Sequence, residues 1–253
     1  MASGGVCIPA MRQERLETGR ECPYVAGMTT ELSPFDAVIF DMDGTLLDTE
    51  MVFRAIVFDV ADELGYQMTD AVHLAMVGSS HETTNRLLVE AYGASFPYTL
   101  FDEKCRAIMK NELAETVPVK PGAREFLQAL KAHKIPLAVA TSSRSPHAYG
   151  HLGRAGLLDL FDDIVTRDDV VNPKPHPEPY LLAAKRLNVD PQACLALEDS
   201  HSGVRAAHAA GMQTIMVPDL VRPTDEITAL CVAVMESLTH VHRLALPKVP
   251  VGA

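Results

Sequence analysis

The fold is decided by the stretch Val38-Ile39-Phe40-Asp41-Met42-Asp43-Gly44. Its apolar run, Val38 to Phe40, is typical of a strand buried on both faces. The run stops at Asp41 and Asp43, two carboxylates spaced i, i+2, and Gly44 then allows a sharp turn. Neighbouring carboxylates oppose each other's ionisation, and a bound divalent cation such as Mg²⁺ would relieve that cost. A capping Asp before a Gly turn would need no cation, so the short pattern alone leaves both interpretations open.

The whole chain has an ordinary globular composition but carries a net charge of −11 over 253 residues. This acidic balance argues against a nucleic-acid polymer or an anionic membrane as partner, whereas a small anionic substrate needs only a few local cations. No apolar stretch approaches the roughly 18 residues of a membrane span, and the N-terminal region lacks the apolar core of a secretory signal. The five cysteines are scattered without a Cys-x-x-Cys pair, which favours reduced thiols in a cytoplasmic protein. Nothing in the sequence demands a partner chain, so a monomer is expected.

Hydrophobic periodicity divides the chain into three parts. Residues 1–33 have little periodic apolar content and are interpreted as a mobile N-terminal tail. Helical spacing without a strand candidate predicts a helical cap over residues 51–117, with helices at about 50–64, 70–76, 81–92 and 100–115. After a helix over 122–133, strands are predicted at 136–140, 163–166, 194–197 and 214–217, with helices between them and a helical remainder to about Leu246.

Strands that alternate with helices predict an α/β fold with a parallel sheet. The expected architecture is a Rossmann-like core, residues 34–50 and 118–253, with the cap inserted after the first strand. In such sheets the ligand crevice lies beyond the carboxyl ends of the strands. The candidate catalytic groups all follow a predicted strand: Asp41 and Asp43, Thr141 and Ser142, Lys174, and Glu198 and Asp199. Taken singly, each of the later groups could merely begin a helix or lie in solvent.

The motifs in which these residues stand resemble those of the haloacid dehalogenase superfamily of phosphotransferases. Phe40-Asp41-Met42-Asp43-Gly44-Thr45-Leu46-Leu47-Asp48-Thr49-Glu50 is similar to its first motif, and Thr141-Ser142-Ser143 to its second. Lys174-Pro175-x-Pro177-x-x-Tyr180 and Glu198-Asp199-Ser200-x-x-Gly203 are similar to the third and fourth. The resemblance spans residues 35 to 220. The helical insertion corresponds to the cap of the beta-phosphoglucomutase-like phosphatase subfamily.

The resemblance implies a role for each motif in a Mg²⁺-dependent phosphatase. Asp41 would attack phosphorus to form an aspartyl-phosphate, and Asp43 would protonate the leaving alcohol and later activate water. Lys174 would neutralise both Asp41 and the phosphate. The implied magnesium ligands are Asp41, the Asp43 main-chain carbonyl and Asp199, with Glu198 either a further ligand or a support behind them. The implied phosphate contacts are Gly44, Thr141, Ser142 and Ser143.

The sequence departs from the mutases of this subfamily at three positions, which favours a phosphatase over a phosphosugar mutase. Phe53 falls where the mutases have a His, Gly78-Ser79-Ser80-His81 replaces their Gly-x-Ser-Arg, and Ser143-Arg144-Ser145 replaces Ser-Lys-Asn. The expected substrate is a small phosphorylated metabolite: a sugar, polyol or nucleoside phosphate. The candidate contacts to its remaining part are His81, Arg86 and Arg144, although the two cap residues could equally lie on a solvated helix face.

Two other classes share parts of this pattern. A phospho-accepting receiver domain also places acids, a Thr or Ser and a Lys at the strand ends. Receivers are shorter, however, and carry the phosphorylated Asp on the third strand without a helical insertion. A dehalogenase of the same fold attacks carbon without a metal and would need neither Asp43 nor the Glu198-Asp199 pair. The mutase therefore remains the main alternative, and the receiver a remote one.

Overall fold

The computed structural model describes residues 32–77 and 81–246. Its core is a six-stranded parallel sheet in the order β3-β2-β1-β4-β5-β6. The strands are β1 (Ala37–Phe40), β2 (Leu137–Ala140), β3 (Asp163–Val165), β4 (Cys194–Glu198), β5 (Gln213–Met216) and β6 (Ala233–Val234). The α/β class and the parallel sheet predicted from the sequence are confirmed.

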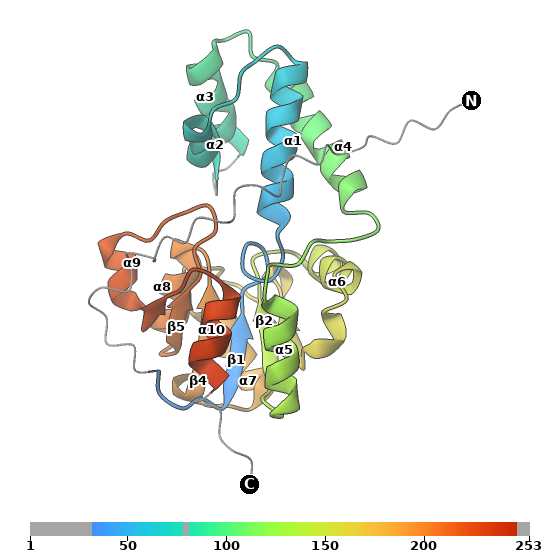
Figure 1. Cartoon of the computed structure of the whole chain (residues 1–253). Helices are drawn as coiled ribbons and strands as arrows, with labels where there is room; N and C mark the ends of the chain where they lie inside the picture. The colour runs from blue at the N-terminus through green and yellow to red at the C-terminus, as the bar shows by residue number, and fades with distance from the viewer. Residues whose placement is uncertain (1–31, 78–80, 247–253) are drawn as a thin grey trace.

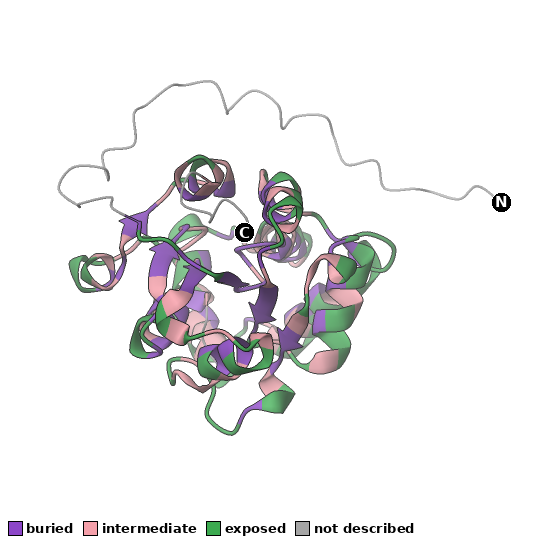
Figure 2. Ribbon diagram, turned by 90° about the horizontal axis from the view of Figure 1, so that it is seen from below, coloured by how far each residue is buried: buried purple, intermediate pink, exposed green. Residues whose placement is uncertain are grey.

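Apolar side chains fill both faces of the sheet, as the continuous hydrophobic strands predict. One face is covered by α5 (Ala123–Ala132), α6 (Ser145–Arg154) and α10 (Leu238–Ala245), and the other by α7 (Glu178–Leu187) and α8 (His201–Ala209). The buried strands lie between these helices when the sheet is viewed from below (Figure 2). Within each parallel pair the strands end at nearly the same level, since Phe40 is opposite both Val139 and Leu197.

The C-terminal remainder was predicted to be helical, and this prediction is wrong in one place. Two helices, α9 (Asp225–Leu230) and α10, flank the short strand β6. In β6, Ala233 pairs with Ile215 of β5, and the amide of Met235 donates to the carbonyl of Met216 (2.8 Å). A strand of two residues is too short to show period-2 alternation, and only the neighbouring sheet edge selects it.

The predicted N-terminal tail, residues 1–33, lies outside the described residues except for its last two. Leu32 is buried in the main apolar core. The amide of Ser33 donates a hydrogen bond to Gln213 Oε1 (2.8 Å), beside the start of β5. Leu32 and Ser33 therefore already contact the core, slightly before the predicted boundary at residue 34.

The helices predicted for residues 51–117 are confirmed and form a cap above the carboxyl edge of the sheet (Figure 1). They are α1 (Thr49–Glu63), α2 (Asp70–Met76), α3 (His81–Tyr92) and α4 (Tyr98–Glu112). The cap packs around an apolar cluster of its own, in which the Phe96 ring contacts those of Tyr66, Tyr92 and Phe101. No helix within the described ranges is both long and apolar enough to cross a membrane.

The two segments that join the cap to the core run side by side. The amide of Asp48 donates to the carbonyl of Pro118, and the amide of Lys120 donates to that of Leu46, each at 2.9 Å. The Lys120 ammonium lies 3.0 Å from an Asp48 oxygen and 2.7 Å from an oxygen of Asp219, which follows β5. Burial alone would lower the pKa of Lys120, but these two carboxylates raise it above its ordinary value. The hinge is therefore held by backbone hydrogen bonds and by a partly buried cation, Lys120.

Candidate active site

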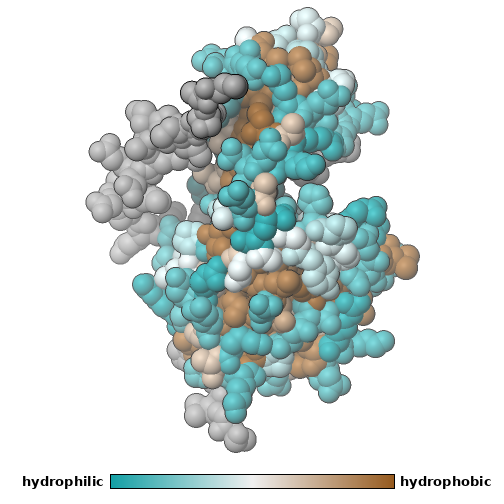
Figure 3. All heavy atoms as spheres, turned by 90° about the vertical axis from the view of Figure 1, so that its right-hand side faces the viewer, coloured by the Kyte–Doolittle hydropathy of each residue, from teal (hydrophilic) through white to brown (hydrophobic). Residues whose placement is uncertain are grey.

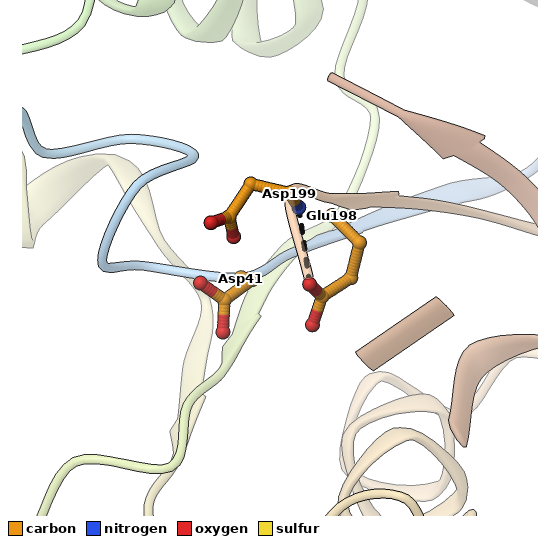
Figure 4. A group of neighbouring side chains, drawn as sticks. All are labelled: Asp41, Glu198 and Asp199. Atoms are coloured by element: carbon orange, nitrogen blue, oxygen red, sulfur yellow. Dashed lines mark hydrogen bonds between the residues drawn. The ribbon is translucent and has the colours of Figure 1, made fainter. Parts of the chain in front are cut away.

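Three carboxylates from two neighbouring strands meet at the carboxyl edge of the sheet. Asp41 follows β1, Glu198 ends β4 and Asp199 follows it, and β1 and β4 are paired in register. One oxygen of each lies within 4.8 Å of the others. Figure 4 shows the carboxylates of Asp41 and Asp199 close together, with that of Glu198 turned back along its own backbone. The prediction that the strand ends bring these acids together is confirmed.

Lys174 is inserted between two of these acids. Its Nζ lies 2.6 Å from Asp41 Oδ1 and 2.6 Å from Glu198 Oε1, and its side chain is only 3% exposed. Burial alone would lower the pKa of Lys174, but the two adjacent carboxylates together raise it above its usual range. The ammonium therefore remains charged and fixes the direction of the Asp41 carboxylate.

Glu198 is completely buried, and both of its oxygens are occupied. Oε1 accepts hydrogen bonds from Lys174 Nζ and the Tyr180 hydroxyl (2.9 Å). Oε2 accepts from the amides of Asp199 (3.1 Å) and Ser200 (3.0 Å) and from the Ser200 hydroxyl (2.9 Å). A Cβ at Gly203, in the first turn of α8, would overlap the Glu198 carboxylate. Both oxygens of Glu198 are thus engaged, which favours a supporting role behind Lys174 over direct metal binding.

Asp43 lies just beyond the carboxylate cluster and is held by two hydroxyls. Thr49 Oγ1 donates to its Oδ1 (3.1 Å), and Ser143 Oγ donates to its Oδ2 (2.7 Å). Ser143 belongs to the loop after β2, where its amide donates to Thr141 Oγ1 (3.0 Å). The turn between Asp43 and the cap depends on Gly44, because its φ is +86° and a Cβ there would overlap the Asp199 carboxylate.

A cavity of about 280 Å³ collects the predicted catalytic groups. Its lining includes Asp41, Asp43, Thr141, Ser142, Lys174 and Asp199 from the core, and Glu50 and Val77 from the cap. Four separate loops of the sequence thus contribute to one site, as expected for the carboxyl edge of a parallel sheet.

The donor set fits a hard divalent cation. Lys174 is the only cationic side chain within bonding distance of the three clustered acids among the described residues. Burial and the neighbouring carboxylates raise the pKa of Asp41 to about 8, and the same causes raise that of Asp199 well above its ordinary range. The Oδ2 atoms of both accept no hydrogen bond from a described residue. Carboxylate oxygens that lack sufficient positive charge are suitable Mg²⁺ ligands.

Comparison with known proteins assigns the chain to a family. Residues 38–217 match the family model described as haloacid dehalogenase-like hydrolase. The chain is a haloacid dehalogenase-like hydrolase. The match includes both strands that carry the carboxylates, the loop of Lys174 and the whole cap, so the predicted resemblance is confirmed.

The relatives of this hydrolase include named phosphatases. It is 38% identical over 180 residues to a phosphorylated carbohydrates phosphatase of Thermotoga maritima, covering 71% of this chain and 83% of the relative. It is 34% identical over 186 residues to a fructose-1-phosphate phosphatase of Escherichia coli, covering 72% of this chain and 96% of the relative. Among solved structures, a putative beta-phosphoglucomutase from Thermotoga maritima superposes with a TM-score of 0.69 at 34% identity, covering 82% of this chain and 99% of the other.

The outer residues predicted to contact the substrate of this hydrolase have other partners. Arg144 is 76% exposed and pairs with Asp168 (3.0 Å). Arg86 lies 4.0 Å from Glu90 on the surface of α3. His81 Nδ1 lies 3.0 Å from the Tyr98 hydroxyl. Substrate contact by these three residues therefore stays a prediction, and Gly78 to Ser80 of the cap loop lie outside the described residues.

The structure adds two residues of the hydrolase to the site. Glu50, in the first turn of α1, lines the central cavity, and burial, followed by the charge of Asp43, raises its pKa. Tyr180 donates to Glu198 from α7 and lies with its ring 5.0 Å below Lys174 Nζ. Both stand within the motifs quoted above, but only their burial beside the carboxylates indicates that they matter for the site.

Proposed function

We propose that this hydrolase is a Mg²⁺-dependent phosphatase that cleaves a small phosphorylated metabolite through an aspartyl-phosphate on Asp41. The observation that carries the proposal is the placement of Asp41. One of its oxygens is fixed by Lys174, and the carboxylate lines a cavity shared with Asp43, Thr141 and Ser142. A nucleophile, hydroxyl donors and an acid thus surround one space large enough for a phosphoryl group.

The residues divide the chemistry between them. An oxygen of Asp41 attacks phosphorus, the ester P–O bond breaks, and Asp43 gives its proton to the departing alkoxide. Asp43 then takes a proton from water, which attacks the phosphorus of the aspartyl-phosphate and releases inorganic phosphate while Asp41 is regenerated. Lys174 and the hydroxyls of Thr141 and Ser142 stabilise the negative phosphoryl oxygens. Asp41, Asp199 and the Asp43 carbonyl would hold Mg²⁺, which adds positive charge at the phosphate.

The relatives reported above support a sugar phosphate as the substrate, and polyol and nucleoside phosphates are further candidates of the same size and charge. Two relatives are named for phosphorylated carbohydrates and for fructose 1-phosphate. We further expect the hydrolase to act in the cytoplasm, because Cys105, Cys194 and Cys231 are buried free thiols. We also expect it to act as a monomer.

A phosphosugar mutase is the second candidate, favoured by the fold shared with a putative beta-phosphoglucomutase. A mutase must protect the aspartyl-phosphate from water and return it to a second hydroxyl of the sugar. Phe53 lines the cap side of the cavities, and Arg144 points to Asp168, so two polar contacts expected of the mutases are missing from these positions. These features support hydrolysis.

The proposal is tested by phosphate release from an aryl phosphate with purified protein. Hydrolysis should require Mg²⁺ and stop when EDTA is added. Asp41→Asn should reduce turnover at least about 10³-fold, because it removes the nucleophile, while circular dichroism and thermal unfolding still show a folded protein. Activity that survives chelation would refute the role of the metal. Activity that survives in the Asp41→Asn variant would refute Asp41 as the nucleophile.

A further inference from the structure

A second cavity, of about 810 Å³, opens beside Asp43 between the cap helix α4 and the core helix α6. Figure 3 views the side of the molecule that carries both helices, and hydrophilic side chains lie along the narrow junction between cap and core. The volume is within the range of small-molecule sites. The inference below rests on the proposed phosphatase function and concerns the part of the substrate that leaves with the alcohol.

The proposed proton donor, Asp43, lies at the boundary between this cavity and the phosphoryl cavity. Asp43 lines both the phosphoryl cavity and the α4–α6 cavity, and Thr49 and Ser143, which hold its carboxylate, line the second one. The leaving oxygen must lie within hydrogen-bond reach of Asp43. A leaving group that starts there is therefore directed into the space between α4 and α6.

Two of the side chains that line this cavity are cations without an ion-pair partner among the described residues, whereas its two carboxylates, Asp43 and Glu50, also line the phosphoryl cavity. Lys110 on α4 and Arg154 on α6 line it from opposite sides, and neither forms an ion pair with any residue in the described ranges. Arg106, by contrast, is neutralised by Asp102 at 2.8 Å. Phe53 and Met109 supply an apolar wall between these groups. Two uncompensated cations facing one cavity create a positive potential that attracts anions.

The neighbouring cavity inside the cap lacks cationic side chains among the described residues that line it. It measures about 220 Å³ and is lined by Asp102 as well as by Glu50, which the two cavities share, and no Lys or Arg from the described chain lines it. An anionic group is therefore repelled from the cap interior and attracted to the α4–α6 side.

We propose that Lys110 and Arg154 form a subsite for a second anionic group, a phosphate or a carboxylate, at the far end of the leaving group. The hydrolase then prefers doubly anionic phosphoesters to neutral ones of the same size. A phosphate and a carboxylate share the chemistry that this subsite recognises, and matched substrates separate them.

The test compares kcat/KM within two pairs of substrates. Fructose 1,6-bisphosphate against fructose 1-phosphate tests a second phosphate, and 6-phosphogluconate against glucose 6-phosphate tests a carboxylate. The wild-type enzyme should prefer the doubly anionic member of at least one pair by about tenfold, as expected for two ion pairs formed by exposed side chains. The double variant Lys110→Gln/Arg154→Gln should abolish that preference, mainly through KM.

The matched control is Lys185→Gln/Arg243→Gln, which removes the same charge from exposed positions on α7 and α10. The control should keep the wild-type ratio. Equal rates within both pairs, or a ratio that survives in the Lys110/Arg154 variant, would overturn the subsite. An enzyme that hydrolyses an aryl phosphate with Mg²⁺ but shows no such preference refutes the subsite alone, whereas one that hydrolyses no phosphoester refutes the proposed function.

Discussion

Replacing Glu198 by Gln tests whether this residue binds the metal or holds Lys174. The change preserves shape and removes one charge from a fully buried position. A Gln amide can present its oxygen to Lys174 and Tyr180 or to the amides of Asp199 and Ser200, but not to both sides. Either orientation leaves buried donors facing an NH₂ group.

The expected loss in the free energy of unfolding follows from those contacts. Loss of a hydrogen bond to a charged group costs about 1.5–3 kcal/mol, and each buried donor left unsatisfied adds about 1–3 kcal/mol. Removal of the charge also relieves repulsion with Asp41, but the lost attraction to Lys174 acts over only 2.6 Å and is larger. We expect the free energy of unfolding to fall by about 3 kcal/mol, which lowers Tm by roughly 6–12 °C.

The catalytic effect distinguishes the two roles. If Glu198 holds Lys174, Glu198→Gln should lower kcat about 10²-fold and change Mg²⁺ affinity little. The matched variant is Asp199→Asn, because among residues 32–77 and 81–246 only Thr45 donates a side-chain hydrogen bond to Asp199 (3.2 Å, to Oδ1), which leaves Oδ2 for the ion. It should weaken Mg²⁺ binding at least about tenfold. Titration calorimetry with Mg²⁺ and steady-state kinetics measure both. A Glu198→Gln enzyme with normal kcat at saturating Mg²⁺ but weak metal binding would refute the support role.

Three further outcomes are expected. Gly203→Ala places a methyl group against the Glu198 carboxylate and should lower the free energy of unfolding in urea by at least about 2 kcal/mol, despite the better helix propensity of Ala. An unchanged urea midpoint would contradict this close packing. The pKa of Asp41 is raised from 3.8 to about 8 by burial, so in EDTA the folded state keeps a proton that the unfolded state releases. The stability of wild type relative to Asp41→Asn should therefore fall as pH rises from about 4 to 8, and a flat difference in Tm would disprove the shift. Lys120→Met leaves two partly buried carboxylates at the hinge without their cation and should lower the free energy of unfolding by about 1–3 kcal/mol; thermal unfolding at wild-type Tm would show that the ion pairs are dispensable.

The sequence predicts the site well for residues that directly follow a strand, because the carboxyl ends of parallel strands form the ligand crevice. Parallel strands end at one edge of a sheet, so the sequence alone predicts that Asp41, Thr141 and Asp199 lie together. Lys174 is harder to place because it stands in a proline-rich loop, and only its resemblance to a family motif predicts its position. Its insertion between two carboxylates is a tertiary contact that no local pattern encodes.

The remaining features depend on packing between distant segments. Nothing near Arg144 in the sequence predicts Asp168, 24 residues later, as its partner. The role of Glu198 depends on which donors surround its oxygens, and Tyr180 reaches it from another helix. Strand β6 exists because β5 offers an unpaired edge, whereas its own two residues carry almost no signal.

The pairing of Leu47 with Val119 has a consequence for how such enzymes diversify. The chain departs from the sheet and returns to it at adjacent points, so about seventy intervening residues can be lengthened, shortened or replaced while the two ends stay together. Recognition of the alcohol can then evolve in one module while bond cleavage is conserved in the other. A chimaera that receives this segment from a relative should acquire the substrate preference of that relative and still catalyse its own reaction.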